Sequence, residues 1–88
     1  DVGLTYVIAV YDVDESRVGK INRTLKSYLI WIQNSVFEGN LSESLYEEMI
    51  NKIIKILSPG DSFIVYILKS DSAFQRYIYG ENRNTNLI

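Results

Sequence analysis

The most constraining feature of this sequence is a pair of segments that are apolar on both of their alternating faces. Residues 4–11 (Leu-Thr-Tyr-Val-Ile-Ala-Val-Tyr) and 62–68 (Ser-Phe-Ile-Val-Tyr-Ile-Leu) are rich in β-branched and aromatic residues, which favour strands. Strands without polar alternation are typically buried on both faces of their sheet. A chain of 88 residues has room for one hydrophobic core, so we expect a single domain built on these strands.

An amphipathic helix is predicted between Ser16 and about Ile30. Apolar residues recur there at spacings of three and four, as in a helix with one buried face, and Asp14 or Ser16 is the candidate N-cap. No acidic residue occurs between Arg17 and Ser35. The polar face of this helix therefore forms a basic ridge, which consists of Arg17, Lys20, Arg23 and Lys26.

The middle of the chain contains an extended segment and a second helix. Residues 31–40 have strand composition, as one strand or two, and we expect a bend near Glu38-Gly39 because glycine inside a strand often marks a bulge. Ser42 or Ser44 then caps a helix with a wide apolar face. Pro59-Gly60 ends this helix.

The order of elements predicts the fold class. Residues 76–79 form a weaker candidate strand, which gives the order strand, helix, strand, helix, strand, strand. This order indicates an α+β sandwich of ferredoxin-like type, an antiparallel sheet with two helices on one face. The second face would expose more apolar surface than a monomer usually tolerates. We therefore expect one domain over residues 4–88, after an N-terminal extension at 1–3, and a homodimer that forms through the sheet faces.

The composition excludes several kinds of chemistry. With no cysteine and no histidine, the chain lacks thiolate nucleophiles, imidazole bases and the usual zinc ligands. Catalysis near neutral pH would rest on carboxylates, Tyr, Lys or Arg, together with a hard cation such as Mg²⁺. The net charge of −2 means that nucleic-acid binding needs a local basic surface. We find no membrane span or signal-peptide pattern and expect a cytoplasmic protein.

Two motifs resemble a known family. Residues 6–13 (Tyr-Val-Ile-Ala-Val-Tyr-Asp-Val), followed by the basic helix, and residues 32–39 (Ile-Gln-Asn-Ser-Val-Phe-Glu-Gly) resemble the CRISPR-associated protein 2 (Cas2) family. Residues 84–88 look like the last strand of that family, and we expect them to add to the edge of the partner's sheet. The resemblance implies a homodimer that serves spacer acquisition, bridges integrase subunits and lies along duplex DNA. Some members are magnesium-dependent endoribonucleases or deoxyribonucleases.

The resemblance also implies roles for particular residues. Asp12 would be the catalytic, metal-binding carboxylate, with Tyr11 and Phe37 in the active region. Two copies of Asp12 at the dimer axis would share one Mg²⁺, and Asp14 and Glu15 are further candidate ligands. Judged from the residues alone, Asp12 also fits a loop cap, and Tyr11 and Phe37 also fit the core.

The basic ridge is the candidate nucleic-acid surface. The guanidinium of Arg17 would hold a phosphate, and Lys20, Arg23 and Lys26 would continue along the backbone, unless they form only a solvated helix face. Gln33 and Ser35 are polar positions suited to hydrogen bonds across the dimer or to nucleic acid.

Two main functions and two alternatives follow. With one well-placed aspartate per subunit and no histidine, the chain offers few catalytic groups for a nuclease. A nucleic-acid-binding assembly subunit is therefore favoured over a magnesium-dependent endonuclease acting on RNA or DNA. A stand-alone toxin-like endoribonuclease and a small-metabolite-binding regulatory dimer are the alternatives.

Overall fold

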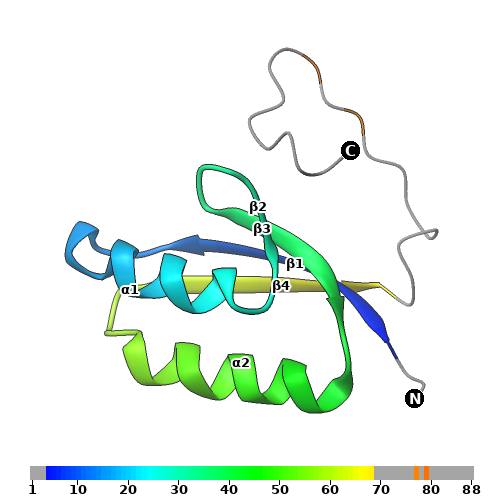
Figure 1. Ribbon diagram of the computed structural model, residues 1–88. Helices are drawn as coiled ribbons and strands as arrows, with labels where there is room; N and C mark the ends of the chain where they lie inside the picture. Colours follow the sequence, from blue (N-terminus) through cyan, green and yellow to red (C-terminus); the bar gives the residue numbers. More distant parts are fainter. Residues whose placement is uncertain (1–3, 69–76, 78, 80–88) are drawn as a thin grey trace.

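The computed structural model describes residues 4–68 and the two tyrosines at positions 77 and 79. Its elements are β1 (Thr5–Asp12), α1 (Glu15–Lys26), β2 (Ile30–Gln33), β3 (Val36–Leu41), α2 (Glu43–Ile56) and β4 (Ser62–Leu68). The strands form one antiparallel sheet in the order β2-β3-β1-β4. Both helices lie on the same side of this sheet (Figure 1). The predicted α+β sandwich with two helices on one face is confirmed.

The core lies between the helices and the sheet. Alternate residues of β1 point towards the helices and are buried, whereas their neighbours point to the opposite face, as expected for the two-residue period of a strand. The buried side chains of this core come from both helices, from the two central strands and from the turn after α1: Val7, Ala9, Tyr11, Ile21, Leu25, Leu29, Phe37, Leu41, Met49 and Ile53. The edge strand β4 adds Phe63 and Val65 at the margin of this core.

The face without helices is apolar along β1 and β4, as the sequence predicted, whereas β3 adds the buried Glu38 and the exposed Asn40 to it. Ile64 and Tyr66 of β4 are 46% and 56% exposed. They pair with Val10 and Ile8 of β1, which are half-buried. We call the surface formed by these four residues the open sheet face.

Helix α1 is shorter than predicted. It ends at Lys26 rather than near Ile30, and the backbone N–H groups of Tyr28 and Leu29 close the last turn by donating to the carbonyl oxygen of Leu25. Ile30 already belongs to β2, where it pairs with Glu38 of β3. The apolar spacing continues beyond the helix because Leu29 still packs into the core, so the periodicity alone could not locate the boundary.

The extended segment is two strands, and the predicted bend was misplaced. The chain turns at Asn34 and Ser35, and Asn34 adopts a φ of +46°, a conformation that asparagine tolerates better than most residues. Gly39 instead lies within β3 opposite Val7. A Cβ atom on Gly39 would lie 3.3 Å from the Cδ2 atom of Leu29, so glycine here allows close packing and does not bend the strand.

The predicted caps are largely confirmed. Asp14 caps α1 by accepting a hydrogen bond from the backbone N–H of Ser16, and Ser42, not Ser44, caps α2 through the N–H of Leu45. Helix α2 ends at Ile56, just before Pro59-Gly60.

Some predictions concern residues beyond those the structure describes. Of the candidate strand at 76–79, only Tyr77 and Tyr79 are described, and neither lies in a strand. Residues 1–3 and 84–88 lie outside the described residues. In the described part, neither helix is long and apolar enough to cross a membrane.

Candidate functional site

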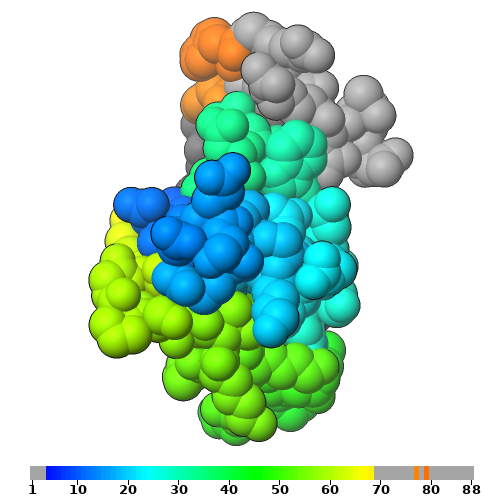
Figure 2. All heavy atoms as spheres, turned by 90° about the vertical axis from the view of Figure 1, so that its left-hand side faces the viewer, coloured from blue at the N-terminus to red at the C-terminus, as the bar shows by residue number. Residues whose placement is uncertain are grey.

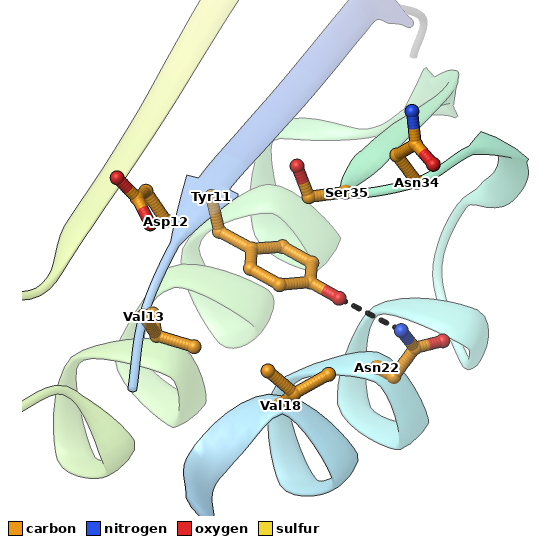
Figure 3. Close-up of a pocket in the computed structure, with 7 residues that line it drawn as sticks. All are labelled: Tyr11, Asp12, Val13, Val18, Asn22, Asn34 and Ser35. Atoms are coloured by element: carbon orange, nitrogen blue, oxygen red, sulfur yellow. Dashed lines mark hydrogen bonds between the residues drawn. The ribbon is translucent and has the colours of Figure 1, made fainter. Parts of the chain in front are cut away.

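Asp12 ends β1 as an exposed carboxylate. Strand alternation places it on the same side of the sheet as Val10, opposite to Tyr11, and Figure 3 shows the two side chains pointing to opposite sides of the strand. Its backbone pairs with Ser62 of β4. No hydrogen bond or ion pair with a described residue occupies its carboxylate oxygens, so Asp12 can accept a ligand.

Tyr11 and Phe37 are core residues. Phe37 is completely buried, Tyr11 is only 6% exposed, and their rings stack with centroids 6.4 Å apart. The Tyr11 hydroxyl accepts a hydrogen bond of 2.8 Å from Nδ2 of Asn22 on α1. Phe37 therefore cannot touch a substrate in this structure. It supports Tyr11, whose hydroxyl end reaches the pocket shown in Figure 3.

Arg17 is engaged within the protein rather than free for phosphate. Its Nε and Nη2 atoms donate to the two carboxylate oxygens of Asp61 at 2.6 and 2.8 Å. The Asp61 side chain, 4% exposed, also accepts hydrogen bonds from the backbone N–H groups of Ser58 and Asp14. The hydrogen bonds from Arg17 and these backbone donors hold the pKa of Asp61 well below its usual range, and the same pair raises the pKa of Arg17. The predicted phosphate contact would have to compete with this ion pair.

The other candidate metal ligands do not complete a site around Asp12. One carboxylate oxygen of Asp14 accepts from the hydroxyl and the backbone N–H of Ser16, and these bonds lower the pKa of Asp14. Glu15 lies exposed in the first turn of α1. Among the residues that the structure describes, no three acidic side chains lie close enough together to hold a metal ion.

The chemistry of Asp12 nevertheless suits one mode of Mg²⁺ binding. This ion keeps several waters and often binds through one or two carboxylates together with phosphate oxygens of the substrate. An exposed aspartate with free oxygens fits that arrangement, and a second copy in a dimer would supply a second carboxylate. The donor set does not fit an ion enclosed by one protomer.

Three cations of the basic ridge are exposed on α1: Lys20, Arg23 and Lys26. In the described part of the chain, none of them has a carboxylate within 4.0 Å. Figure 2 faces the end of the molecule where β1 passes into α1 and shows the surface of α1 open to solvent beside α2. The structure thus divides the ridge into Arg17, which is paired, and these three cations, which we call the outer ridge.

Two shallow pockets of about 340 Å³ each flank Asp12. One lies on the side of the Arg17–Asp61 pair. The other lies between β1, α1 and the β2–β3 turn and is shown in Figure 3; we call it the amide pocket because Asn22 and Asn34 line it. Ser35 also lines the amide pocket, whereas Gln33 is exposed at the end of β2.

Sequence reasoning missed Asn22, Asn34 and Asp61. A signal existed for Asn34, because the dipeptide Asn-Ser between two apolar segments is typical of a turn. Asp61 is separated from Arg17 by 44 positions, and Asn22 meets Tyr11 from another element, so no local pattern marks either contact.

Comparison with known proteins places the chain among CRISPR proteins. The family model for CRISPR associated protein Cas2 matches residues 5–76. The CRISPR-associated endoribonuclease Cas2 of Dictyoglomus turgidum is 42% identical over 81 residues, which cover 90% of this chain and 92% of that protein. A second relative, CRISPR-associated endoribonuclease Cas2 2 of Archaeoglobus fulgidus, is 39% identical over 90% of this chain and 87% of its own length. A crystal structure of Cas2 superimposes with a TM-score of 0.85 at 39% identity and covers 91% of each chain. The fold and these matches together show that this chain belongs to the CRISPR-associated Cas2 family.

Proposed function

We propose that this chain is a nucleic-acid-binding subunit of CRISPR spacer acquisition, which works as a homodimer and bridges integrase subunits. The observation that carries this proposal is the outer ridge. Three exposed cations without a described carboxylate partner give an otherwise acidic chain a local surface for phosphates. Contacts of this kind bind the nucleic-acid backbone without reading its sequence.

The open sheet face supports the homodimer. Ile64 and Tyr66 are partly exposed there beside Val10 and Ile8, and pairing two such faces would remove apolar surface from water. Asp12 lies at the end of the same face, so a two-fold axis through the sheets is consistent with two Asp12 carboxylates near each other. The proposal thus joins the dimer and the candidate metal site on one surface.

The dimer is tested by sedimentation equilibrium at micromolar concentration. We expect a mass of about twice the 10.2 kDa of the chain, and a shift to the monomer in Ile64→Glu, which places a charge on the open sheet face. Ile54→Glu is the matched control, because Ile54 is 60% exposed on α2, away from that face. Monomeric wild-type protein would refute the dimer.

The assembly role is tested with the integrase subunit of the same CRISPR system. Wild-type protein and integrase should elute together with duplex DNA in size-exclusion chromatography. The Ile64→Glu variant should form this complex poorly, because a monomer cannot bridge two partners. Duplex binding that requires one particular sequence would contradict the backbone-binding role.

A second candidate function is magnesium-dependent cleavage of RNA. It is favoured by the free carboxylate of Asp12 and by the endoribonuclease names of the relatives. Asp12 would hold Mg²⁺ together with the phosphate of the substrate, and the ion would supply an activated water and neutralise developing charge. Tyr11, fixed by Asn22, would line the site without entering the chemistry.

This activity is tested by incubating labelled single-stranded RNA and duplex DNA with the protein, with and without Mg²⁺. Asp12→Asn should abolish cleavage and leave binding intact, because it removes the charge but preserves the size of the side chain. Glu47→Gln, at an exposed position of α2, is the matched control. Equal cleavage by wild type and Asp12→Asn would exclude Asp12 as the catalytic carboxylate.

A further inference from the structure

Another surface pocket lies at the end of the molecule opposite to Asp12. It is formed where the first turn of α2 meets the start of β1 and the end of β4. Figure 1 shows these three ends together, on the far side from the connection between β1 and α1. The pocket has a volume of about 380 Å³, and its described lining consists of Thr5, Glu43, Tyr46 and Ile67. We call it the Glu43 pocket.

The floor of the Glu43 pocket is apolar. Ile67 pairs with Val7 across the sheet, and because Val7 is buried beneath the helices, Ile67 also faces the helix side. Ile67 nevertheless remains 57% exposed, since β4 is an edge strand of the described sheet. The ring of Tyr46 packs against the core and forms an apolar wall beside it.

The polar groups of the Glu43 pocket have no partner in the described part of the chain. Glu43 is exposed in the first turn of α2, and no described lysine or arginine nitrogen lies within 4.0 Å of its carboxylate. The side-chain hydroxyls of Thr5 and Tyr46 likewise make no hydrogen bond with a described residue. A carboxylate and two hydroxyl oxygens therefore border an apolar hollow with their acceptor capacity unused.

This lining selects against several kinds of ligand. A phosphate or a carboxylate would be repelled by Glu43, and an apolar side chain would cover that carboxylate without compensating its charge. A divalent cation would find one carboxylate and an apolar floor, whereas such ions need several oxygen ligands. The remaining class is a group with an apolar stem and a positively charged end.

Arginine meets these requirements better than lysine. Its planar guanidinium donates two parallel hydrogen bonds to one carboxylate and stacks on aromatic rings, and the Glu43 pocket offers Glu43 and Tyr46 for these two contacts. The hydroxyl of Thr5 can accept one of the remaining N–H groups, and the methylene stem would cover Ile67. The ammonium group of lysine carries the same charge but lacks the planar fork.

We propose that the Glu43 pocket is the docking site for an arginine side chain of a partner protein. This inference rests on the proposed bridging function, which makes the integrase subunit that partner, and it adds the chemical group that is recognised. The pocket lies on the helix side of the sheet, so a homodimer formed through the open sheet face leaves it accessible in both protomers. The outer ridge lies on the other helix, α1. One dimer can therefore hold two partners and a nucleic acid at the same time.

The first test is an NMR titration of ¹⁵N-labelled protein with N-acetyl-arginine amide at millimolar concentration. N-acetyl-citrulline amide is the matched probe, because it has almost the same shape but no charge. We expect saturable shifts of the backbone N–H signals of Glu43, Tyr46 and Ile67 with the arginine probe and much smaller ones with citrulline. The signal of Asn51, exposed further along α2, should not move. No shift with arginine, or equal shifts with both probes, would overturn the inference.

The second test measures the affinity of variants for the integrase subunit by isothermal titration calorimetry. Glu43→Gln should weaken binding about tenfold, the effect of losing a charge-assisted hydrogen bond. Glu47→Gln is the matched control, because Glu47 is exposed one turn further along α2 but does not line the pocket. Equal losses in the two variants would show that the partner senses only the general negative charge of α2, and would overturn the inference.

A charge exchange identifies the arginine itself. Glu43→Arg should abolish the complex without lowering the melting temperature by more than a few degrees, because position 43 is exposed. Exposed arginines of the integrase subunit are then changed one at a time to glutamate. One of these integrase variants should restore binding to Glu43→Arg while binding wild-type protein poorly. A complete set of such variants without any rescue would contradict the docking of an arginine at Glu43.

The outcomes separate the inference from the function on which it rests. Integrase binding that is identical for wild type and Glu43→Gln would leave the proposed function standing and overturn the docking site. Wild-type protein that binds no integrase subunit would refute the proposed function. In that case the NMR titration decides the pocket alone: selective binding of the arginine probe would support an arginine site, and its absence would overturn it.

Discussion

The division of the basic ridge leads to a quantitative prediction about nucleic-acid binding. Replacing Lys20, Arg23 and Lys26 together by alanine should weaken duplex affinity and flatten its salt dependence, whereas Arg17→Ala should change the slope little. Each phosphate neutralised contributes about 0.9 to the slope of log affinity against log salt. Three outer cations give about 2.7 for one protomer, and twice that in a dimer whose protomers both contact the duplex. Arg17 is excluded from this sum because Asp61 occupies two of its donors.

The assay is fluorescence anisotropy with two duplexes of unrelated sequence, measured from 50 to 200 mM salt. Over this interval, loss of the slope from a single protomer reduces the fall in affinity by about 40-fold relative to wild type. The outer ridge is exposed, so the triple variant should remain folded. Lys55→Ala, which removes an exposed cation from α2, is the control and should reproduce the wild-type slope. Identical slopes for wild type and the triple variant would refute the reasoning and leave the ridge as a solvated helix face.

Three further predictions concern the folded scaffold. Asp61→Asn should lower the melting temperature at neutral pH. Because the folded-state pKa of Asp61 is lowered, the loss of melting temperature relative to wild type should be complete above a pH of about 4 and should shrink as the pH falls below it. A loss of melting temperature that grew with acid would contradict this. Ser42→Ala should cost about 1 kcal/mol in the free energy of unfolding measured with urea, since Ser42 caps α2, while Ser44→Ala should cost clearly less. Ile53→Ala should lower the free energy of unfolding by about 2–5 kcal/mol because Ile53 is completely buried. The neighbouring Ile54, 60% exposed, should tolerate alanine. Equal losses of stability at the two positions would show that the packing differs from that described.

Local patterns were sufficient for the elements and their faces. The doubly apolar segment at 4–11 became β1, and the helical spacing after Asp14 became α1, because periods of two and of three to four residues require no knowledge of the partner. A capping serine at 42 or 44 was also predictable, because a cap bonds only a few positions along the chain, and the structure selects Ser42. The carboxylate at the end of β1 and the basic ridge were equally visible, since each needs only one element.

Boundaries that depend on packing could not be predicted in this way. The apolar series of α1 runs on to Leu29, and only the pairing of Ile30 with Glu38 shows that β2 has begun. Gly39 suggested a bend, but the atom that requires glycine there belongs to Leu29, ten positions earlier. In both cases the deciding contact joins two elements, so the sequence of neither element contains it.

The sequence by itself therefore determined the order of the main elements, the family resemblance and the groups available for chemistry. Only the tertiary structure decided which of those groups are free. It pairs Arg17 with Asp61 across 44 positions, places Phe37 beneath Tyr11, and brings Asn22 and Asn34 to one pocket beside Asp12. The physical reason is that hydrogen bonds and burial act over a few ångströms in space, whereas a sequence pattern records only separation along the chain.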